Sequence, residues 1–257
     1  MIKVITFDWG DTLAVNWGMP YIATERRLLR RLAGDLAELG GRADAAWAEA
    51  CLRELQAEWN VTADATRNPE HREMDFPALM RGWVAATGLS VEDPRLAPAL
   101  ERAWDRMTDT VIPYAEALPA LASLHGRYRL GILSHVPWPG FACRRWFQRH
   151  GLAPHLDFYS LSCEVGRIKP HPDHYHDAIR QAGCAPDEIL HVGDHPMRDV
   201  AGGRRFGLRT CLRRTERIYA EENLDACAPD AEILRLDEVE GVAEALAHCH
   251  QGLGVRG

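Results

Sequence analysis

The first fifteen residues, MIKVITFDWGDTLAV (residues 1–15), place a group of polar side chains directly after a short apolar run. Residues 2–7 are mostly apolar and β-branched, which is typical of a strand buried on both faces of a sheet. Asp8 follows this run, and a glycine, a second acid and a hydroxyl occupy positions 10–12. A carboxylate at the end of a buried strand can act as a nucleophile, as a metal ligand or as both.

Further strand patterns occur only in the second half of the chain. In residues 15–111, apolar side chains recur at steps of three and four, which predicts amphipathic helices and no strand. Asp44, Asp75 and Asp93 can cap three of these helices. The later strands are predicted at residues 130–133, 158–161, 189–192, 209–212 and 233–236, and helices are predicted at residues 117–124, 141–150, 174–182, 197–206 and 239–248.

Strands and helices in this arrangement predict a doubly wound α/β fold, in which helices cover both faces of a parallel sheet. We expect a Rossmann-like catalytic core formed by residues 1–14 and 112–257, and an inserted all-helical cap domain formed by residues 15–111. Glu25 is expected on the solvated face of a cap helix, and the tail, residues 251–257, is expected to fray. The tryptophans expected in the core of the cap are Trp47, Trp59, Trp83 and Trp104.

The composition excludes several classes of protein. The 257 residues carry a formal net charge of −7 with no basic stripe, so no nucleic-acid partner is expected. The seven cysteines form no C-x-x-C pair, which is typical of free thiols in a reducing compartment. No apolar stretch has the length of a membrane span or the pattern of a signal peptide. We expect a cytoplasmic monomer or homodimer with no membrane partner.

Three polar residues follow predicted strands, namely Asp8, Ser134 and Asp194. In parallel sheets, ligands bind outside the carboxyl ends of the strands, so these side chains are expected at one edge. The chain has 30 lysine and arginine residues, and lysine occurs only at Lys3 and Lys169. Because arginine is otherwise preferred, a lysine at position 169 indicates a specific role. Carboxylates can hold Mg²⁺, while a hydroxyl and an ammonium can hold phosphoryl oxygens. Such a set of groups suits phosphoryl transfer.

Four short motifs resemble those of the haloacid dehalogenase-like hydrolase superfamily. They are Asp8-x-x-x-Thr12, Ser134, Lys169-Pro170, and Gly193-Asp194 followed by Asp199. Their order and spacing match the family over nearly the whole chain, and the predicted helical insertion matches the cap of its first subfamily. The resemblance implies a Mg²⁺-dependent hydrolase, a phosphatase that acts on a small phosphorylated substrate through an aspartyl phosphate.

The resemblance also implies catalytic roles. Asp8 matches the family's nucleophile, and Lys169 matches the lysine that neutralises charge. Thr12 and Ser134 match the hydroxyls that orient the nucleophile and hold phosphoryl oxygens.

The same resemblance implies a metal site. Asp8, the carbonyl oxygen of Gly10 and Asp194 match the magnesium ligands, and Asp199 matches the carboxylate that supports the metal through water or hydrogen bonds. Without the resemblance, Asp199 has the ordinary alternative of capping a helix or of pairing with Arg198 or Arg204.

One position departs from the family's pattern. Family phosphatases place a general acid–base aspartate two residues after the nucleophile, where this chain has Gly10. Asp11 is one position further on and can either take over this work or cap the following turn. His135 and His195 are substrate-binding candidates that can also compensate, since histidine titrates near neutral pH. A chain without any replacement is expected to cleave alkyl phosphates slowly and to accumulate the aspartyl phosphate.

Two other functions remain open. Gly10 is compatible with a family member that binds phosphate or a metabolite with little turnover. It is also compatible with a carbon–halogen hydrolase, because a halide leaves without a proton. The haloacid dehalogenases, however, lack the metal-binding aspartate that Asp194 matches.

Overall fold

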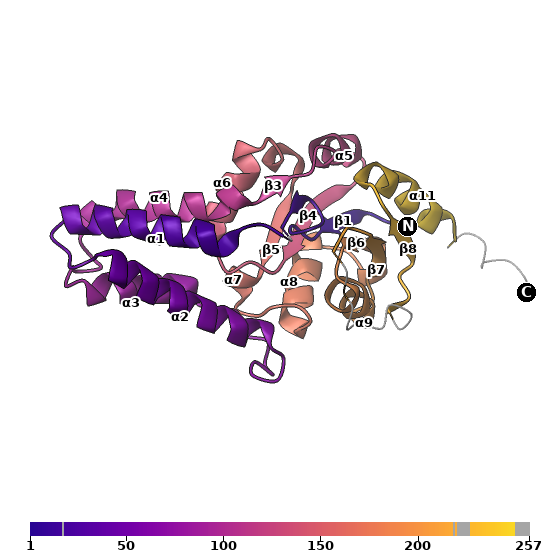
Figure 1. Ribbon diagram of the computed structural model, residues 1–257. Coiled ribbons are helices and arrows are strands. Elements are labelled where there is room, and N and C mark those ends of the chain that lie inside the picture. The colour runs from indigo at the N-terminus through magenta and orange to yellow at the C-terminus, as the bar shows by residue number, and fades with distance from the viewer. Residues whose placement is uncertain (17, 218, 220–226, 250–257) are drawn as a thin grey trace, which may run out of the picture.

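A six-stranded sheet lies at the centre of the molecule (Figure 1). The computed structural model describes residues 1–16, 18–217, 219 and 227–249, so the predicted tail, residues 251–257, lies outside the described part. The strands are β1 (Val4–Phe7), β4 (Arg129–Ser134), β5 (Phe158–Leu161), β6 (Ile189–Gly193), β7 (Arg209–Arg213) and β8 (Ala231–Ile233). Their order is β5-β4-β1-β6-β7-β8, and every neighbouring pair is parallel. The chain therefore winds outward from β1 in both directions, as a doubly wound sheet does.

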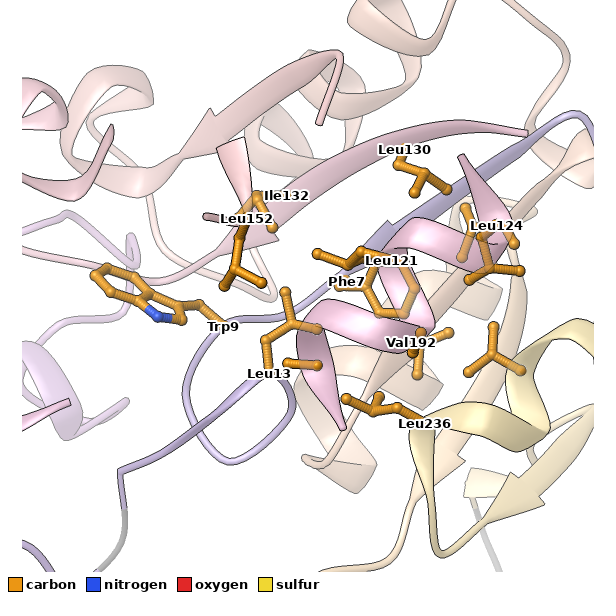
Figure 2. Close-up of a cluster of buried hydrophobic side chains, with 14 of the residues drawn as sticks. Phe7, Trp9, Leu13, Leu121, Leu124, Leu130, Ile132, Leu152, Val192 and Leu236 are labelled. Carbon is orange, nitrogen blue, oxygen red and sulfur yellow. The ribbon is translucent and has the colours of Figure 1, made fainter. Parts of the chain in front are cut away.

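Helices cover both faces of this sheet, which confirms the predicted α/β fold. One face carries α5 (Ala117–Leu124), α6 (Gly140–Arg149) and α11 (Val239–Cys249), and the other carries α8 (Pro172–Ala182) and α9 (Gly202–Arg205) (Figure 1). Alternate side chains of β1 point to opposite faces. Phe7 packs in the cluster that contains Leu121 of α5 (Figure 2), whereas Val4 packs in the cluster that contains Tyr175 of α8.

Four helices form a group beyond one end of the sheet (Figure 1). They are α1 (Tyr21–Glu38), α2 (Ala45–Ala63), α3 (Phe76–Ala86) and α4 (Ala97–Met107). A separate apolar cluster, which includes Leu36, Leu55 and Phe76, holds them together. Asp44 and Asp75 cap α2 and α3 as predicted, since each carboxylate accepts a backbone N–H at 2.8 Å.

The structure differs from the predicted elements at several ends. Asp93 caps a short turn, Pro94–Leu96, that precedes α4. Val15, which we predicted within the helical stretch, belongs to β2 (Ala14–Val15), which pairs antiparallel with β3 (Ile112–Pro113). The remaining short helical elements are Thr108–Thr110, Ala153–His155, α7 (Ser162–Val165), Pro186–Glu188 and Leu236–Glu238.

Two further differences have local causes. The predicted strand at residues 233–236 ends earlier, because the Glu238 carboxylate accepts the backbone N–H groups of Leu234 and Arg235 at 3.0 and 2.7 Å. The predicted helix at residues 197–206 begins as a π-helix, Pro196–Ala201, before α9. Such wide turns are frequent at functional sites. Within the described residues, none of the helices combines the length and apolar character needed to cross a membrane.

Candidate active site

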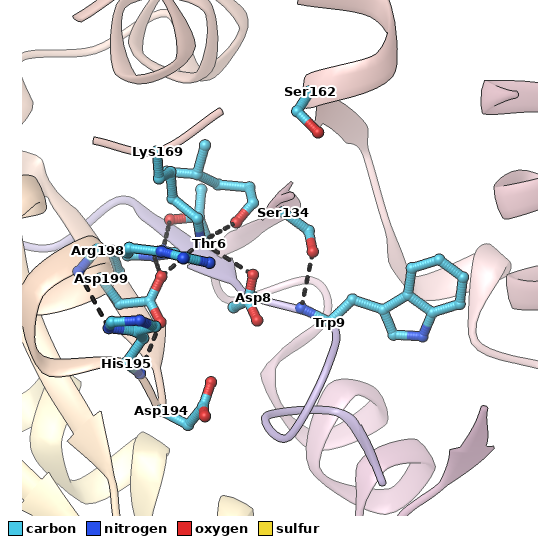
Figure 3. A network of polar contacts seen from close by, with 12 residues as sticks. Thr6, Asp8, Trp9, Ser134, Ser162, Lys169, Asp194, His195, Arg198 and Asp199 are labelled. Atoms are coloured by element: carbon cyan, nitrogen blue, oxygen red, sulfur yellow. Dashed lines mark hydrogen bonds and ion pairs between the residues drawn. The ribbon is translucent and has the colours of Figure 1, made fainter. Parts of the chain in front are cut away.

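The carboxyl ends of three neighbouring strands bring the predicted residues together. Phe7 is the register partner of both Ile132 in β4 and Val192 in β6, so the segments that follow the three strands leave the sheet at the same level. Asp8 is fixed there by its backbone N–H, which donates to the Val192 carbonyl at 2.9 Å. Figure 3 shows Asp8 close to Lys169, with Asp194 on the same side of the sheet.

Lys169 forms the centre of this site. Its buried ammonium donates to Asp8 Oδ1 at 2.9 Å, to the Leu133 carbonyl at 2.9 Å and to Asp199 Oδ1 at 2.5 Å (Figure 3). These contacts use all three donors of an ammonium group. Burial alone would lower the pKa of Lys169, but Asp199 and Asp8 raise it above its ordinary value. The ammonium therefore stays charged beside the carboxylate that is predicted to be the nucleophile.

Asp199 is held by several donors. Its second oxygen accepts the backbone N–H of His195 at 2.9 Å, and the oxygen that Lys169 contacts also lies 3.1 Å from His191 Nε2. Burial would raise the pKa of Asp199, but Lys169 and His191 together hold it well below its ordinary range. Since both oxygens have partners, Asp199 suits the supporting role predicted for it better than that of a direct metal ligand. His191 in turn contacts the Thr6 hydroxyl at 3.0 Å.

Three carboxylates meet at a point suited to a hard cation. Oxygens of Asp8, Asp194 and Asp199 lie within 4.8 Å of one another. Burial, with the charge of Asp199, raises the pKa of Asp8, and burial with the charges of Asp199 and Asp8 raises that of Asp194 well above its usual value. A divalent cation would relieve this repulsion, and an all-oxygen donor set fits Mg²⁺. Gly10 lines the same cavity as Asp8 and Asp194, so the residues present fit the predicted ion.

Tyr219 and Arg217 also contact this part of the site, and neither belongs to a motif that predicts it. The Tyr219 hydroxyl donates to the Asp194 carboxylate, and the Arg217 guanidinium lies 4.6 Å from the centre of the Tyr219 ring. Arg217 also pairs with Asp11 at 3.1 Å. The His195 ring lies 4.5 Å from the Tyr219 ring. Burial and the nearby Arg198 lower the pKa of His195 to about 3, so this ring is neutral near pH 7.

The loop after β1 turns only some of its side chains toward the site. Trp9 points into the core (Figures 2 and 3), where it packs against Trp146 at a ring distance of 4.7 Å. Asp11 has a φ of 56°, a left-handed conformation that aspartate tolerates. Its carboxylate accepts the Asn16 backbone N–H at 2.9 Å and so caps the turn that follows β1. Thr12 is buried, and its hydroxyl has no hydrogen-bond partner within the described part of the chain.

Ser134 lies at the end of β4, next to the loop that carries Asp8. Its hydroxyl is 3.4 Å from the Trp9 backbone N–H, which donates to it (Figure 3). Ser134, Asp11 and Thr12 are buried and do not line the cavity, whereas Asp8, Gly10 and Lys169 do. The structure thus brings the predicted residues together but gives them unequal access to a ligand.

The cavity above this site has a volume of about 580 Å³ and lies between the sheet edge and the helical insertion. Asp8, Lys169, His135 and His195 line it from the core. The predicted position of Trp59 in the core of the cap is wrong, because this side chain is 42% exposed and lines the cavity. Its place near the end of the α2 pattern turns it toward the site and away from the apolar cluster.

Glu25 is a second residue of the helical insertion that differs from our prediction. We expected it on a solvated helix face, but it lines the cavity, and burial raises its pKa. Tyr21, one turn earlier on α1, also lines the cavity and donates its hydroxyl to Asn16. Both side chains therefore face the space in which a bound ligand would lie.

Glu73, from the segment between α2 and α3, contacts the site through His135. Its carboxylate oxygen Oε2 lies 3.2 Å from Nε2 of His135 and accepts the Ser162 hydroxyl. The Trp59 ring stacks on the His135 ring, with centres 5.6 Å apart and planes inclined by 21°. Glu73 had no sequence signal, because its partners lie far away in the chain.

The chain is similar to several known hydrolases. Residues 2–207 match the family model of the haloacid dehalogenase-like hydrolases. One relative is a glyceraldehyde 3-phosphate phosphatase of Methanopyrus kandleri, 30% identical over 96% of this chain and 99% of the relative. Another is a phosphoserine phosphatase of Thermus thermophilus, 31% identical over 95% of this chain and 100% of the relative. A similar solved structure is a 2-haloacid dehalogenase from Pseudomonas syringae, with a TM-score of 0.63 and 25% identity. The match covers 95% of this chain and 99% of the dehalogenase.

Proposed function

Because the chain belongs to the haloacid dehalogenase-like hydrolases, we propose that it is a Mg²⁺-dependent phosphatase of small phosphomonoesters that forms an aspartyl phosphate on Asp8. The contact of the buried Lys169 ammonium with both Asp8 and Asp199 carries this proposal. A buried positive charge beside a carboxylate at a strand end can neutralise a phosphoryl group as it is transferred. The two relatives named as phosphatases support the same substrate class.

In this proposal the helical insertion is a cap over the site. Residues 1–14 and 112–257 form the catalytic core, and residues 15–111 form the cap. The phosphoryl group would lie against Asp8 and Lys169, and the rest of the substrate would extend toward Glu25 and Trp59, which line the cavity from the cap side. A cap that contributes to the cavity can exclude water during the transfer.

The reaction would take place in two steps. In the first, a carboxylate oxygen of Asp8 attacks phosphorus and the bond from phosphorus to the ester oxygen breaks. In the second, a water oxygen attacks phosphorus, the bond to Asp8 breaks and inorganic phosphate leaves. Lys169 would neutralise the phosphoryl oxygens in both steps, and Ser134, whose hydroxyl accepts the Trp9 backbone N–H, would hold the loop that carries Asp8.

Magnesium would be held by Asp8, the Gly10 carbonyl and Asp194. When bound, the ion would neutralise negative charge on the phosphoryl group. Asp199 would support this arrangement through its contacts with Lys169 and the His195 backbone.

The proposal is tested with a chromogenic ester, 4-nitrophenyl phosphate, in the presence of Mg²⁺. Turnover is expected to stop with EDTA and to return with added Mg²⁺, and Asp8→Asn should abolish it. Asp35→Asn serves as the matched control, because Asp35 lies on α1 and pairs with Arg102. Stoichiometric binding of phosphate without any Asp8-dependent turnover would instead identify a binding protein.

A carbon–halogen hydrolase is the second candidate, supported by the similarity to the 2-haloacid dehalogenase and by the absence of a side chain at Gly10. It predicts chloride release from 2-chloropropionate that EDTA does not affect. We expect no such release, because three buried carboxylates that lie so close together fit a cation.

A further inference from the structure

Gly10 leaves the site without the usual proton donor for a leaving alkoxide. Asp11 cannot replace it in the observed conformation, because its carboxylate is buried outside the cavity and holds Asn16 and Arg217. Among the described residues that line the cavity on the core side, His135 is a titratable group outside the carboxylate cluster. It directly follows Ser134 at the end of β4 and so stands beside the loop that carries Asp8.

Glu73 is fixed to the core beside His135 by its backbone. The Glu73 N–H donates to the Gly166 carbonyl at 3.1 Å, and the Ile168 N–H donates to the His71 carbonyl at 2.8 Å. This short pairing joins the segment before α3 to the segment before Lys169. Glu73 therefore has a defined position relative to the catalytic residues, even though it comes from the helical insertion.

The Glu73 carboxylate is buried, with 2% of the side chain exposed, and it is surrounded by donors. One oxygen accepts the Met74 N–H at 2.8 Å, and the other accepts the Ser162 hydroxyl and faces His135 Nε2 at 3.2 Å. Burial would raise the pKa of Glu73, but His135 and Ser162 together lower it. Glu73 is thus ionised at neutral pH, and its negative charge faces the His135 ring.

The His135 ring is held on a second side by Trp59, which stacks on it. The ring thus lies between the Glu73 carboxylate, 3.2 Å from Nε2, and an aromatic plane, which together restrict its orientation. Among the described residues its Nδ1 makes no hydrogen bond, so this nitrogen is open to a ligand. A carboxylate that orients a catalytic imidazole in this way is a known source of rate enhancement in hydrolases.

We propose that His135 is the general acid–base of this site and that Glu73 is its positioning residue, so that the pair replaces the carboxylate absent at Gly10. The inference rests on the proposed phosphatase function. As the bond between phosphorus and the ester oxygen breaks, the His135 imidazolium gives its proton to that oxygen and an alcohol leaves. The neutral imidazole then takes a proton from the attacking water as the bond to Asp8 breaks, which restores the imidazolium.

The test compares two esters of similar shape on the Mg²⁺-loaded full chain. Phenyl phosphate has a poorer leaving group than 4-nitrophenyl phosphate, so it depends more on protonation. His135→Asn should lower kcat for phenyl phosphate by about 10²-fold or more. For the nitrophenyl ester, the rate of the first step, in which nitrophenol is released and the aspartyl phosphate forms, should fall much less. The nitrophenyl ester should then give a burst followed by slow turnover, because the aspartyl phosphate persists. Equal losses for the two esters, with no burst, would overturn the proposal.

Glu73→Gln tests the positioning role. We expect a loss in kcat of about 10-fold for phenyl phosphate, with KM nearly unchanged. The double variant Glu73→Gln/His135→Asn should be no slower than His135→Asn alone, because Glu73 acts through His135. Additive losses would show that Glu73 does not act through this ring. If Glu73→Gln does not fold, the test uses His135→Ala with imidazole added to the solution. Recovery of phenyl phosphate turnover supports the proposal, and no recovery contradicts it.

Matched controls separate this inference from the function on which it rests. Glu54→Gln removes another carboxylate of the helical insertion, one that accepts the Trp83 ring N–H, and His125→Asn removes an exposed histidine of the core. Both should keep full activity. If the wild type shows no Asp8-dependent hydrolysis, the proposed function fails. If hydrolysis depends on Asp8 but His135→Asn and Glu73→Gln keep wild-type rates, only the present inference fails.

Discussion

Gly193 and Asp199 are in contact at a distance that leaves no room for a side chain between them. A Cβ atom on Gly193 would lie 2.2 Å from Asp199 Cγ. The glycine that ends β6 thus allows the Asp199 carboxylate to reach both Lys169 and the His195 backbone.

Gly193→Ala should therefore displace Asp199. We expect the free energy of unfolding to fall by about 1–3 kcal/mol, as for other overpacked sites, and phosphatase turnover to fall with it. Urea unfolding measures the first effect. Gly34→Ala is the matched control, because a Cβ there meets no atom within 4 Å and the position lies within α1. This control should increase stability slightly, and a similar result for Gly193→Ala would contradict the predicted clash.

The two lysines of the chain provide a second comparison. Lys169→Met would leave the carboxylates of Asp8 and Asp199 buried without their shared cation. Loss of one partner from a buried ionic group costs about 3–5 kcal/mol, so the urea midpoint should fall strongly and turnover should be lost. Lys3→Met removes an exposed ammonium that pairs with Glu188, and it should change neither property appreciably. Equal effects of the two variants would argue against the buried ionic centre.

Gly10→Asp tests how the missing carboxylate relates to His135. A Cβ at Gly10 would lie 3.1 Å from the Asn16 side chain, which must move slightly. We expect little gain in the wild type, since His135 already transfers the proton. In the His135→Asn background, the new carboxylate should restore phenyl phosphate turnover, most clearly when Asn16→Ala makes room. A large gain in the wild type would indicate that the natural site lacks an acid–base.

Metal binding can be measured by calorimetry without any substrate. Asp194→Asn should weaken Mg²⁺ binding, because it removes a charged oxygen from the cluster. Tyr219→Phe should strengthen binding, since it removes the hydroxyl that donates to Asp194 in the observed structure. Asp35→Asn is again the control and should bind Mg²⁺ as the wild type does. Unchanged affinity in Asp194→Asn would exclude this residue as a ligand.

His174 should make stability depend on pH. Burial lowers its pKa from the ordinary 6.5 to about 3, so the unfolded chain binds the proton more readily than the folded chain. The contribution of neutral His174 to the free energy of unfolding is then fully present above pH 6.5. It falls as the pH drops toward 3, by at most about 1.4 kcal/mol per pH unit. His174→Gln should flatten this part of a urea-unfolding series, whereas His176→Gln, at an exposed position, should not. Parallel curves for all three proteins would contradict the assignment.

The fold was largely predictable because its signals are local. The apolar run before Asp8 and the strand patterns after residue 113 correspond to strands of the observed sheet, since burial on both faces requires such runs. Asp44 and Asp75 cap helices because each carboxylate accepts a backbone N–H from three residues further on, a spacing that a sequence pattern can contain. The π-helix at Pro196–Ala201 was missed, because the apolar pattern of residues 197–206 does not distinguish a π-helix from an α-helix.

The site was predictable where a strand end or a family motif placed a residue. Asp8 and Asp194 follow strands, so their meeting follows from the sheet topology. Glu73, Trp59 and Tyr219 reach the site from segments without a strand, and their partners are distant in the chain. No periodicity encodes such contacts, so the helical pattern places Trp59 in the cap interior and gives no role to Glu73.

The pairing of β2 with β3 has a consequence for how this architecture can vary. Val15 and Ile112 are register partners, so the chain leaves the core and returns to it at adjacent points. Segments between such neighbouring points can be exchanged or shortened without stretching the flanking backbone. The core's β1 and β4 thus keep their pairing whatever length of chain lies between them. Substrate preference can then diversify through the inserted helices while the chemistry at the sheet edge stays the same.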